Sequence, residues 1–143
     1  MEERVNRLNI PSGKKDDAHR TAVISYVLRS DLLRRPTTRD RITAAALAGE
    51  TGGRFTQRTF DTFLILADAY LTGQSLIHSD VHILSDVPRS TARRSLARLS
   101  RLGALASRTD PRDHRRRFVE LTPRLCELLD QIIDECVVEF SEL

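Results

Sequence analysis

Apolar residues recur at helical spacing through the first half of the chain and predict three helices. The first covers about residues 17–33 and is stopped by the Arg-Arg-Pro sequence that follows. The second is short and is capped by Thr37 or Thr38. The third begins at Thr56 and ends at Gly73. Its apolar residues follow an i, i+3, i+4, i+7 pattern: Phe60, Phe63, Leu64, Ala67, Tyr70 and Leu71.

Two short helices separated by a tight turn are predicted next. A brief extended piece at 76–77 precedes Ser79, which is a good N-cap for a helix of about two turns. Residues 85–87 form the turn, and a second helix covers 88–102 with a proline in its first turn. Gly103 supplies a left-handed C-terminal cap. This order of elements is typical of a helix-turn-helix.

After Gly103 the apolar pattern changes from helical to alternating. It predicts strands at 104–109 and 116–121 joined by a loop at 110–115. Thr122 then caps a final helix with a continuous apolar stripe. The stripe consists of Leu125, Leu128, Leu129, Ile132, Ile133, Cys136, Val137 and Phe140. Such a stripe serves either as intramolecular core or as the seam of a dimer, and the sequence leaves both interpretations open.

The composition indicates a globular protein of one domain. The chain has 143 residues, of which 40% are hydrophobic and 30% charged. We expect a cytoplasmic protein without membrane association, because no apolar run has membrane-spanning length and the N-terminus has no signal-peptide core. Two cysteines, Cys126 and Cys136, are too few for a disulfide framework, and we expect both to be reduced.

The distribution of charge is more informative than the net charge of +3. Residues 88–124 contain eleven arginines and three acids, a local charge of +8. The rest of the chain has twelve basic and seventeen acidic residues and carries −5. A local excess of this size indicates an anionic partner for one surface.

The helix predicted at 88–102 has one apolar and one basic face. At about 100° per residue, the residues Ala92, Leu96, Leu99 and Leu102 fall on one side. All the arginines of the helix fall on the other side, with no acid between them. The second helix of a helix-turn-helix enters the major groove with its N-terminus first. We therefore expect Arg89, Ser90, Arg93 and Arg94 to approach base edges, and Arg98 and Arg101 to meet phosphates.

The predicted hairpin is a second basic element beside this helix. Its arginines are Arg108, Arg112, Arg115, Arg116 and Arg117. A basic loop of this kind can straddle the DNA backbone or reach into the minor groove. We expect Asp113 to hold Arg115 in position by a charge-assisted hydrogen bond.

The stretch SDVPRSTARRSLARLSRLGAL, followed by RTDPRDHRRRFVELT, resembles the MarR family of bacterial winged-helix transcription regulators. The resemblance covers about residues 60–130. It implies a homodimer on a pseudo-palindromic operator, usually a repressor and often released by a small aromatic ligand. It also implies that Arg89, Ser90, Thr91, Arg93 and Arg94 act in the recognition helix, with Asp113 and Arg115 as the wing pair.

The sequence departs from the family pattern in three places. Asp86 stands where the turn often has glycine, and His114 replaces the usual wing arginine. The C-terminal arm has about twenty residues, whereas the family usually has two helices there. Dimerisation must then rest on residues 17–72 and the stripe at 123–140.

The sequence as a whole predicts a mostly α fold with a small β wing. We expect a flexible segment at 1–16, a helical extension at 17–55 that is a candidate for dimerisation, a winged helix-turn-helix at 56–122, and a C-terminal helix at 123–143. The predicted wing spans 104–121. The predicted DNA-contacting residues are Arg89, Ser90, Thr91, Arg93, Arg94, Arg98, Arg101, Arg108, Arg112, Asp113, Arg115 and Arg116.

Other functions are less well supported by the sequence. One alternative is a winged helix that docks on another protein, which a basic wing disfavours. Another is nonspecific binding of DNA or RNA through the same surface. We expect no enzymatic activity, cofactor or metal, because no nucleophile stands beside a suitable base. His78 and His82 have the i, i+4 spacing of helical zinc ligands, but no third ligand is evident.

Overall fold

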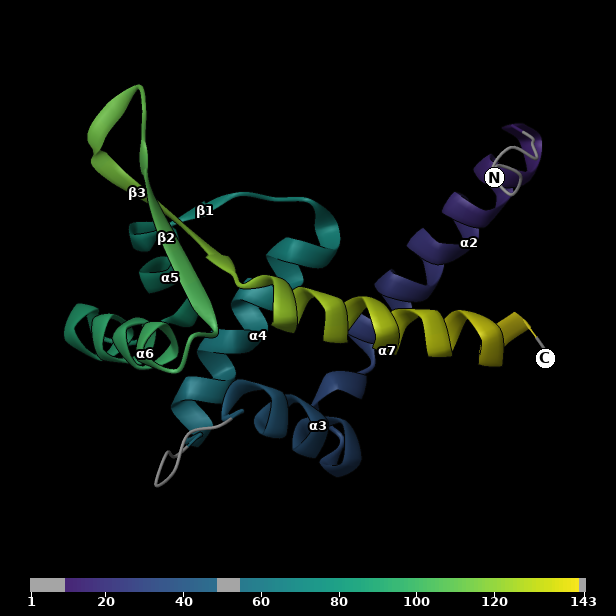
Figure 1. Ribbon diagram of the computed structural model, residues 1–143, viewed down its shortest axis with the longest axis horizontal. Coiled ribbons are helices and arrows are strands. Elements are labelled where there is room, and N and C mark those ends of the chain that lie inside the picture. Colours follow the sequence, from purple (N-terminus) through teal and green to yellow (C-terminus); the bar gives the residue numbers. More distant parts are fainter. Residues whose placement is uncertain (1–9, 49–54, 142–143) are drawn as a thin grey trace.

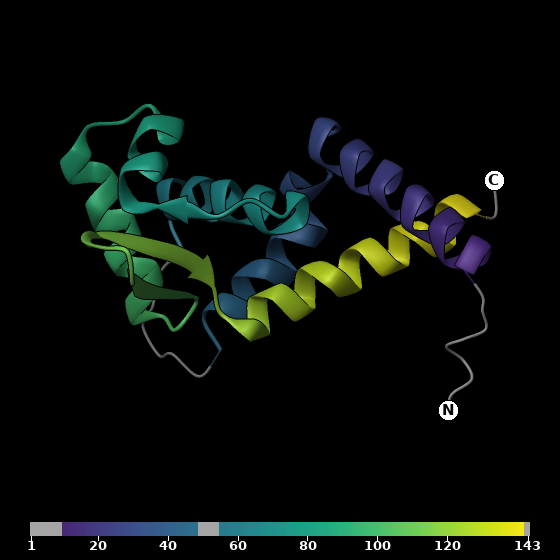
Figure 2. The ribbon, with the colours of Figure 1, turned by 90° about the horizontal axis from the view of Figure 1, so that it is seen from above.

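The computed structural model describes residues 10–48 and 55–141, with side chains described from residue 17. The molecule is elongated, and its two ends are built from different elements (Figures 1 and 2). One end carries a β-hairpin and two short helices. At the other end two long helices run at an angle to each other toward the chain termini. The fold is mostly helical with one small sheet, as the sequence predicts.

The elements, in chain order, are α2 (Ile10–Arg29), the 3-10 turn η1 (Leu32–Arg34), α3 (Pro36–Ala46), α4 (Gln57–Thr72), β1 (Leu76–Ile77), α5 (His78–Ser85), α6 (Arg89–Arg101), β2 (Leu105–Asp110), β3 (Asp113–Leu121) and α7 (Pro123–Ser141).

Helix α4 is the central element of the core and forms where the sequence predicts it. The hydroxyl of Thr56 accepts a hydrogen bond from the Thr59 amide at 3.2 Å, which satisfies one of the free N–H groups at the helix start. Gly73 ends the helix in the left-handed region, at φ 74°. Helix α4 contacts α2, α5, α6, α7 and β3, so it connects the two ends of the molecule.

The N-terminal helices differ from the prediction at their starts. Helix α2 begins at Ile10, so residues 10–16 are helical and precede the predicted start at 17, while residues 1–9 lie outside the described part. Helix α3 begins at Pro36, with Arg35 at the N-cap position. The threonine cap predicted at 37 or 38 is therefore wrong, because both residues lie inside the helix. A proline is tolerated there because the first amides of a helix have no intrahelical partner. The turn predicted at 49–54 also lies outside the described residues.

The helix-turn-helix is formed by α5 and α6. The predicted Ser79 cap is wrong, because α5 begins at His78 and the Asp80 carboxylate accepts the Ile77 amide at 3.0 Å. Asp86, which stands where the turn often has glycine, adopts the left-handed conformation, at φ 54°. Aspartate tolerates this region because its short polar side chain can hydrogen-bond locally.

The sheet is antiparallel, with the strand order β1-β3-β2. Its hairpin is longer and its loop shorter than predicted, because pairing continues to Asp110 and Asp113. The buried Asp110 carboxylate accepts the Arg112 amide at 2.9 Å and thereby closes a tight turn. His114 and Arg115 consequently lie on β3, and the loop expected at 110–115 is reduced to Pro111 and Arg112.

The apolar stripe of α7 lies in the core of its own chain. Leu125, Leu129 and Ile133 are completely buried, and Ile132 and Cys136 are nearly so. Helix α7 packs against α2, α3 and α4. The interpretation as intramolecular core is therefore the right one for these residues. A dimer seam would have to use the exposed side chains of the same helices, such as Val138.

Candidate nucleic-acid interface

Helix α6 separates its apolar and basic residues as the sequence predicts. Ala92, Leu96, Leu99 and Leu102 are at most 5% exposed and pack into the core. Arg89, Ser90, Arg93, Arg94 and Arg101 are exposed, and Arg98 is half-buried. The core contacts hold the orientation of the helix, so the arginines must face outward.

Thr91 differs from the expectation that it contacts DNA. Only 7% of its surface is exposed, because it lies on the edge of the apolar face of α6. Its hydroxyl accepts a hydrogen bond from the Arg94 guanidinium at 3.4 Å. At this exposure Thr91 offers little surface to a duplex.

The hairpin carries its arginines beside α6, as predicted. Arg112, Arg115 and Arg116 are exposed, and the Arg115 side chain is 90% so. Asp113 holds Arg115 in the expected way: one carboxylate oxygen accepts both the main-chain amide and Nε of Arg115 at 3.1 Å. These hydrogen bonds, the side-chain one foremost, hold the pKa of Asp113 below its usual range.

Two hairpin arginines also have partners inside the protein. Arg108 stacks on the Phe118 ring at 4.5 Å, and its Nε lies 3.8 Å from the Glu120 carboxylate. Arg116 Nε lies 3.8 Å from the buried Asp110. Both guanidinium groups remain about half exposed, so these long ion pairs orient the arginines toward the surface without covering them.

Comparison with known proteins identifies the fold. No protein-family model matches the sequence, and no curated protein matches it either. Among solved structures, a mutant of MepR from a multidrug-resistant S. aureus clinical isolate matches with a TM-score of 0.52. The identity is 21%, and the match covers 83% of this chain and 82% of MepR.

Two further structures are similar. The S. aureus MepR–DNA complex matches with a TM-score of 0.50 and 17% identity, covering 82% of this chain and 86% of that chain. PcaV of Streptomyces coelicolor, in complex with its natural ligand, is 25% identical over 78% of this chain and 77% of its own, at a TM-score of 0.42.

The fold is the winged helix-turn-helix of the MepR structures. The resemblance drawn from the sequence is thus confirmed at the level of the fold. In this winged helix α6 takes the place of the recognition helix, and the β2–β3 hairpin is the wing. None of the described helices is long and apolar enough to span a membrane.

Arg124 joins α6 to α3, and no pattern in the sequence singled it out. Its guanidinium donates to four main-chain carbonyls at 2.8–3.1 Å: Ala45 and Ala46 at the end of α3, and Leu102 and Gly103 at the end of α6. Thr122 directly precedes α7, as predicted, and its hydroxyl donates a further hydrogen bond to the Gly103 carbonyl at 2.8 Å. One cation thus satisfies the free carbonyls of two helix ends.

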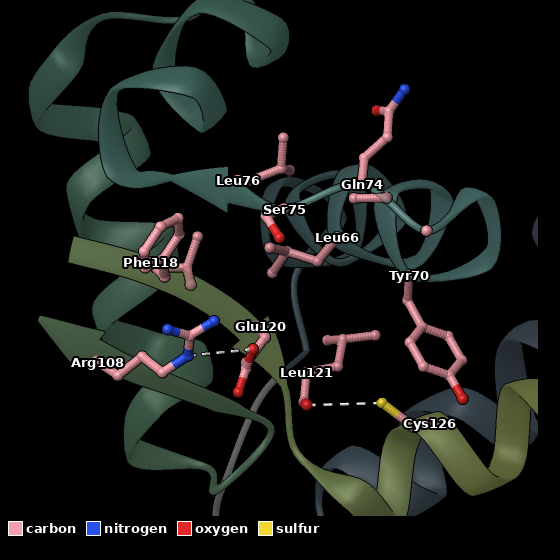
Figure 3. Close-up of a pocket in the computed structure, with 13 residues that line it drawn as sticks. Leu66, Tyr70, Gln74, Ser75, Leu76, Arg108, Phe118, Glu120, Leu121 and Cys126 are labelled. Carbon is pink, nitrogen blue, oxygen red and sulfur yellow. Dashed lines mark hydrogen bonds and ion pairs between the residues drawn. The ribbon is translucent and has the colours of Figure 1, made fainter. Parts of the chain in front are cut away.

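The largest pockets of the winged helix include one between α4, β3 and the start of α7, with a volume of about 450 Å³ (Figure 3). Leu66, Leu76 and Leu121 form apolar walls, and the wing residue Arg108 forms part of the rim. Tyr70 points across the pocket toward α7 and donates a hydrogen bond to Asp130 at 2.8 Å. Burial, and then this hydrogen bond, raise the pKa of Tyr70 to about 12, so the phenol keeps its proton.

The two cysteines lie in surroundings that favour the protonated thiol. Burial raises the pKa of the Cys126 and Cys136 thiols, which disfavours the reactive thiolate. Phe60 and Phe63, which could have lined an effector pocket, are fully buried core residues. In residues 17–48 and 55–141, no three His, Cys, Asp or Glu side chains gather as a metal site would require.

Proposed function

We propose that this protein is a sequence-specific DNA-binding transcriptional regulator, and that it acts as a homodimeric repressor in the cytoplasm. The observation that carries the proposal is the exposed basic face of α6, with the basic wing beside it. No acidic side chain interrupts that face along the helix. Such a surface complements the phosphates and the guanine edges of a major groove.

Base reading and phosphate binding are assigned to different parts of the basic surface. Arg89, Ser90, Arg93 and Arg94 lie in the first turns of α6 and would reach base edges. Arg101 and Arg98 lie toward its other end and would meet the backbone. The wing arginines 108, 112, 115 and 116, with Asp113 as a holder, would contact the neighbouring backbone or minor groove.

Selection of bound sites from random duplex DNA tests this assignment. For the wild type we expect an enriched sequence. Arg94→Ala should relax the preference at one base position, because it removes a base contact worth about 1–3 kcal/mol. Arg101→Ala should keep the preferred sequence, weaken binding to all duplexes, and lower the slope of log K against log salt by about one unit.

The two variants are controls for each other because both remove one exposed arginine from the same helix. Uniform loss of affinity in both would show that α6 does not read bases. An unselective wild type that also binds double-stranded RNA would favour the nonspecific alternative.

We propose that dimerisation uses the outer faces of the long helices. Tyr26 on α2 and Val138 on α7 are 44% and 60% exposed, and both helices extend away from the wing (Figures 1 and 2). A homodimer predicts two half-sites about one helical turn apart in the selected DNA. Solitary half-sites would contradict it.

We further propose that the pocket of Figure 3 holds a small aromatic effector. Its volume and its mainly apolar walls suit a ring-sized ligand. Because Arg108 on the wing strand forms part of the rim, a bound ligand would touch the DNA-contacting surface directly.

A change at the rim of the pocket tests this proposal. Ser75 lines the pocket and is exposed, so Ser75→Trp should fill the space without disturbing the core. In a thermal-shift screen of phenols and aromatic acids, a ligand at a hundredfold excess over its Kd should stabilise the wild type by about 2.7 kcal/mol. The variant should lose this shift and keep its DNA affinity. An equal shift in both proteins would place the ligand elsewhere.

A further inference from the structure

A small cavity lies between the two helices of the helix-turn-helix. Its volume is about 70 Å³. The polar side chains that line it are His78, Ser79 and His82 from α5, and Arg89 and Arg93 from α6. Both arginines belong to the exposed basic face, so the cavity adjoins the surface proposed to meet DNA.

The two imidazoles that line this cavity have unused hydrogen-bonding capacity. His78 Nε2 and His82 Nδ1 are both buried, and neither has a hydrogen-bond partner within the described part of the chain. A buried polar atom without a partner costs about 1–3 kcal/mol. Two such atoms at one small cavity indicate that a polar group from outside completes the site.

The charges around the cavity select an anion. Arg89 and Arg93 line it, and Arg117 on β3 is close enough to act on His78 electrostatically. The nearest acid on α5, Asp80, has its carboxylate engaged with the Ile77 amide. Because three cations surround the imidazoles, a metal ion would be repelled and a phosphate would be attracted.

We propose that this cavity receives a backbone phosphate of duplex DNA, to which His78 and His82 donate their free ring nitrogens, and that His78 takes up a proton as the phosphate binds. The inference rests on the proposed function. It adds two residues of α5 to the DNA-contacting surface and makes the affinity depend on pH.

The direction of the pH dependence follows from the environment of His78. Burial first, and then the charges of Arg117 and Arg93, lower the pKa of His78 in the free protein. A bound phosphate neutralises those two arginines and favours the imidazolium, so the pKa rises in the complex. Binding is then accompanied by proton uptake, and affinity rises as the pH falls through the bound-state pKa. The rise is at most about one log unit per pH unit for one proton.

The experiment measures Kd by fluorescence anisotropy with a labelled random-sequence duplex between pH 5.5 and 8. We compare the wild type with His78→Gln and His82→Gln. The matched control is His19→Gln, because His19 lies on α2 and contacts Ser141 on α7. His114→Gln removes the exposed wing histidine, so it measures how much that residue contributes to the pH dependence of the affinity.

As the pH falls from 8 to 5.5, the affinity of the wild type and of His19→Gln should rise about tenfold more than the affinity of His78→Gln. His82→Gln should weaken binding at every pH. As a second measurement, NMR titration of the His78 imidazole in the wild-type protein should show its midpoint rising when the duplex is added. This second measurement decides the matter should a variant fail to fold.

An unchanged His78 midpoint on addition of DNA, or equal pH profiles for wild type and His78→Gln, would overturn the inference and leave the proposed function standing. The inference would also be overturned, and the proposed function would stand, if Zn²⁺ shifted the imidazole resonances of both histidines and DNA did not. Absence of DNA binding by the wild type at low salt would overturn the proposed function itself.

Discussion

Replacing Arg93 and Arg94 together with glutamate should weaken binding to duplex DNA by at least about a hundredfold, since two favourable phosphate or base contacts become repulsive. Both side chains are exposed on the outer face of α6, and neither contributes to the apolar face that holds the helix in place. The free energy of unfolding should therefore change little. Gel-shift titration at two salt concentrations measures the affinity, and thermal unfolding measures the stability.

A matched control separates local charge from net charge. Arg29 on α2 and Arg35 before α3 are also exposed, and their replacement by glutamate changes the net charge by the same amount. We expect this control pair to retain DNA binding within about threefold, because charges separated by more than a Debye length are largely screened. Equal losses in the two pairs would mean that binding follows total charge, and the recognition-helix assignment would be abandoned.

The largest effect on stability is expected for Arg124→Ala, at about 3 kcal/mol. The substitution removes four hydrogen bonds at the ends of α3 and α6. The carbonyls of Ala46 and Leu102 lose their side-chain donor, while those of Ala45 and Gly103 keep one other donor each. Hydrogen bonds from a charged group are each worth more than neutral ones, and partly buried acceptors that lose their donor are costly. Urea unfolding followed by circular dichroism measures the loss.

Two comparison variants show whether the guanidinium geometry matters. Arg124→Lys keeps the charge but offers a single ammonium, which cannot reach both helix ends in the same forked arrangement, so it should recover only part of the stability. Arg41→Ala removes an exposed ion pair with Glu135 and should cost no more than about 1 kcal/mol. If Arg124→Ala is as mild as Arg41→Ala, the four hydrogen bonds do not hold the two helices together.

Loss of the Arg124 contacts should also affect DNA binding. Its guanidinium joins the end of α6 to the end of α3, so it fixes the recognition helix relative to the long helices. Under conditions where Arg124→Ala is still folded, we expect weaker binding to the selected operator than to random duplex, because a displaced helix reads bases less well than it meets phosphates.

Local sequence patterns determined most of the helical framework and the basic face. The helical spacing of apolar residues and arginines in α6 correctly predicted which of them are buried and which face outward. Thr91, which lies on the boundary between the two faces, is more buried than its predicted DNA contact implies. The start of α4 at Thr56 and its end at Gly73 were equally readable, because each depends on backbone geometry within a few residues.

The hairpin was only partly predictable from the sequence. Alternation located both strands, but Asp110, Pro111 and the basic residues after them carry the composition of a loop. Their pairing into a longer hairpin depends on the buried Asp110 carboxylate closing the turn, and its burial is a tertiary property.

What the sequence by itself determined is the winged-helix order of elements and the concentration of arginine on one helix and one hairpin, because both follow from periodicity along the chain. Only the tertiary structure decided that the α7 stripe is core, that Arg124 joins two helix ends, and that His78 and His82 share a cavity with Arg89 and Arg93. These properties depend on contacts between residues far apart in sequence, where no local period carries a signal.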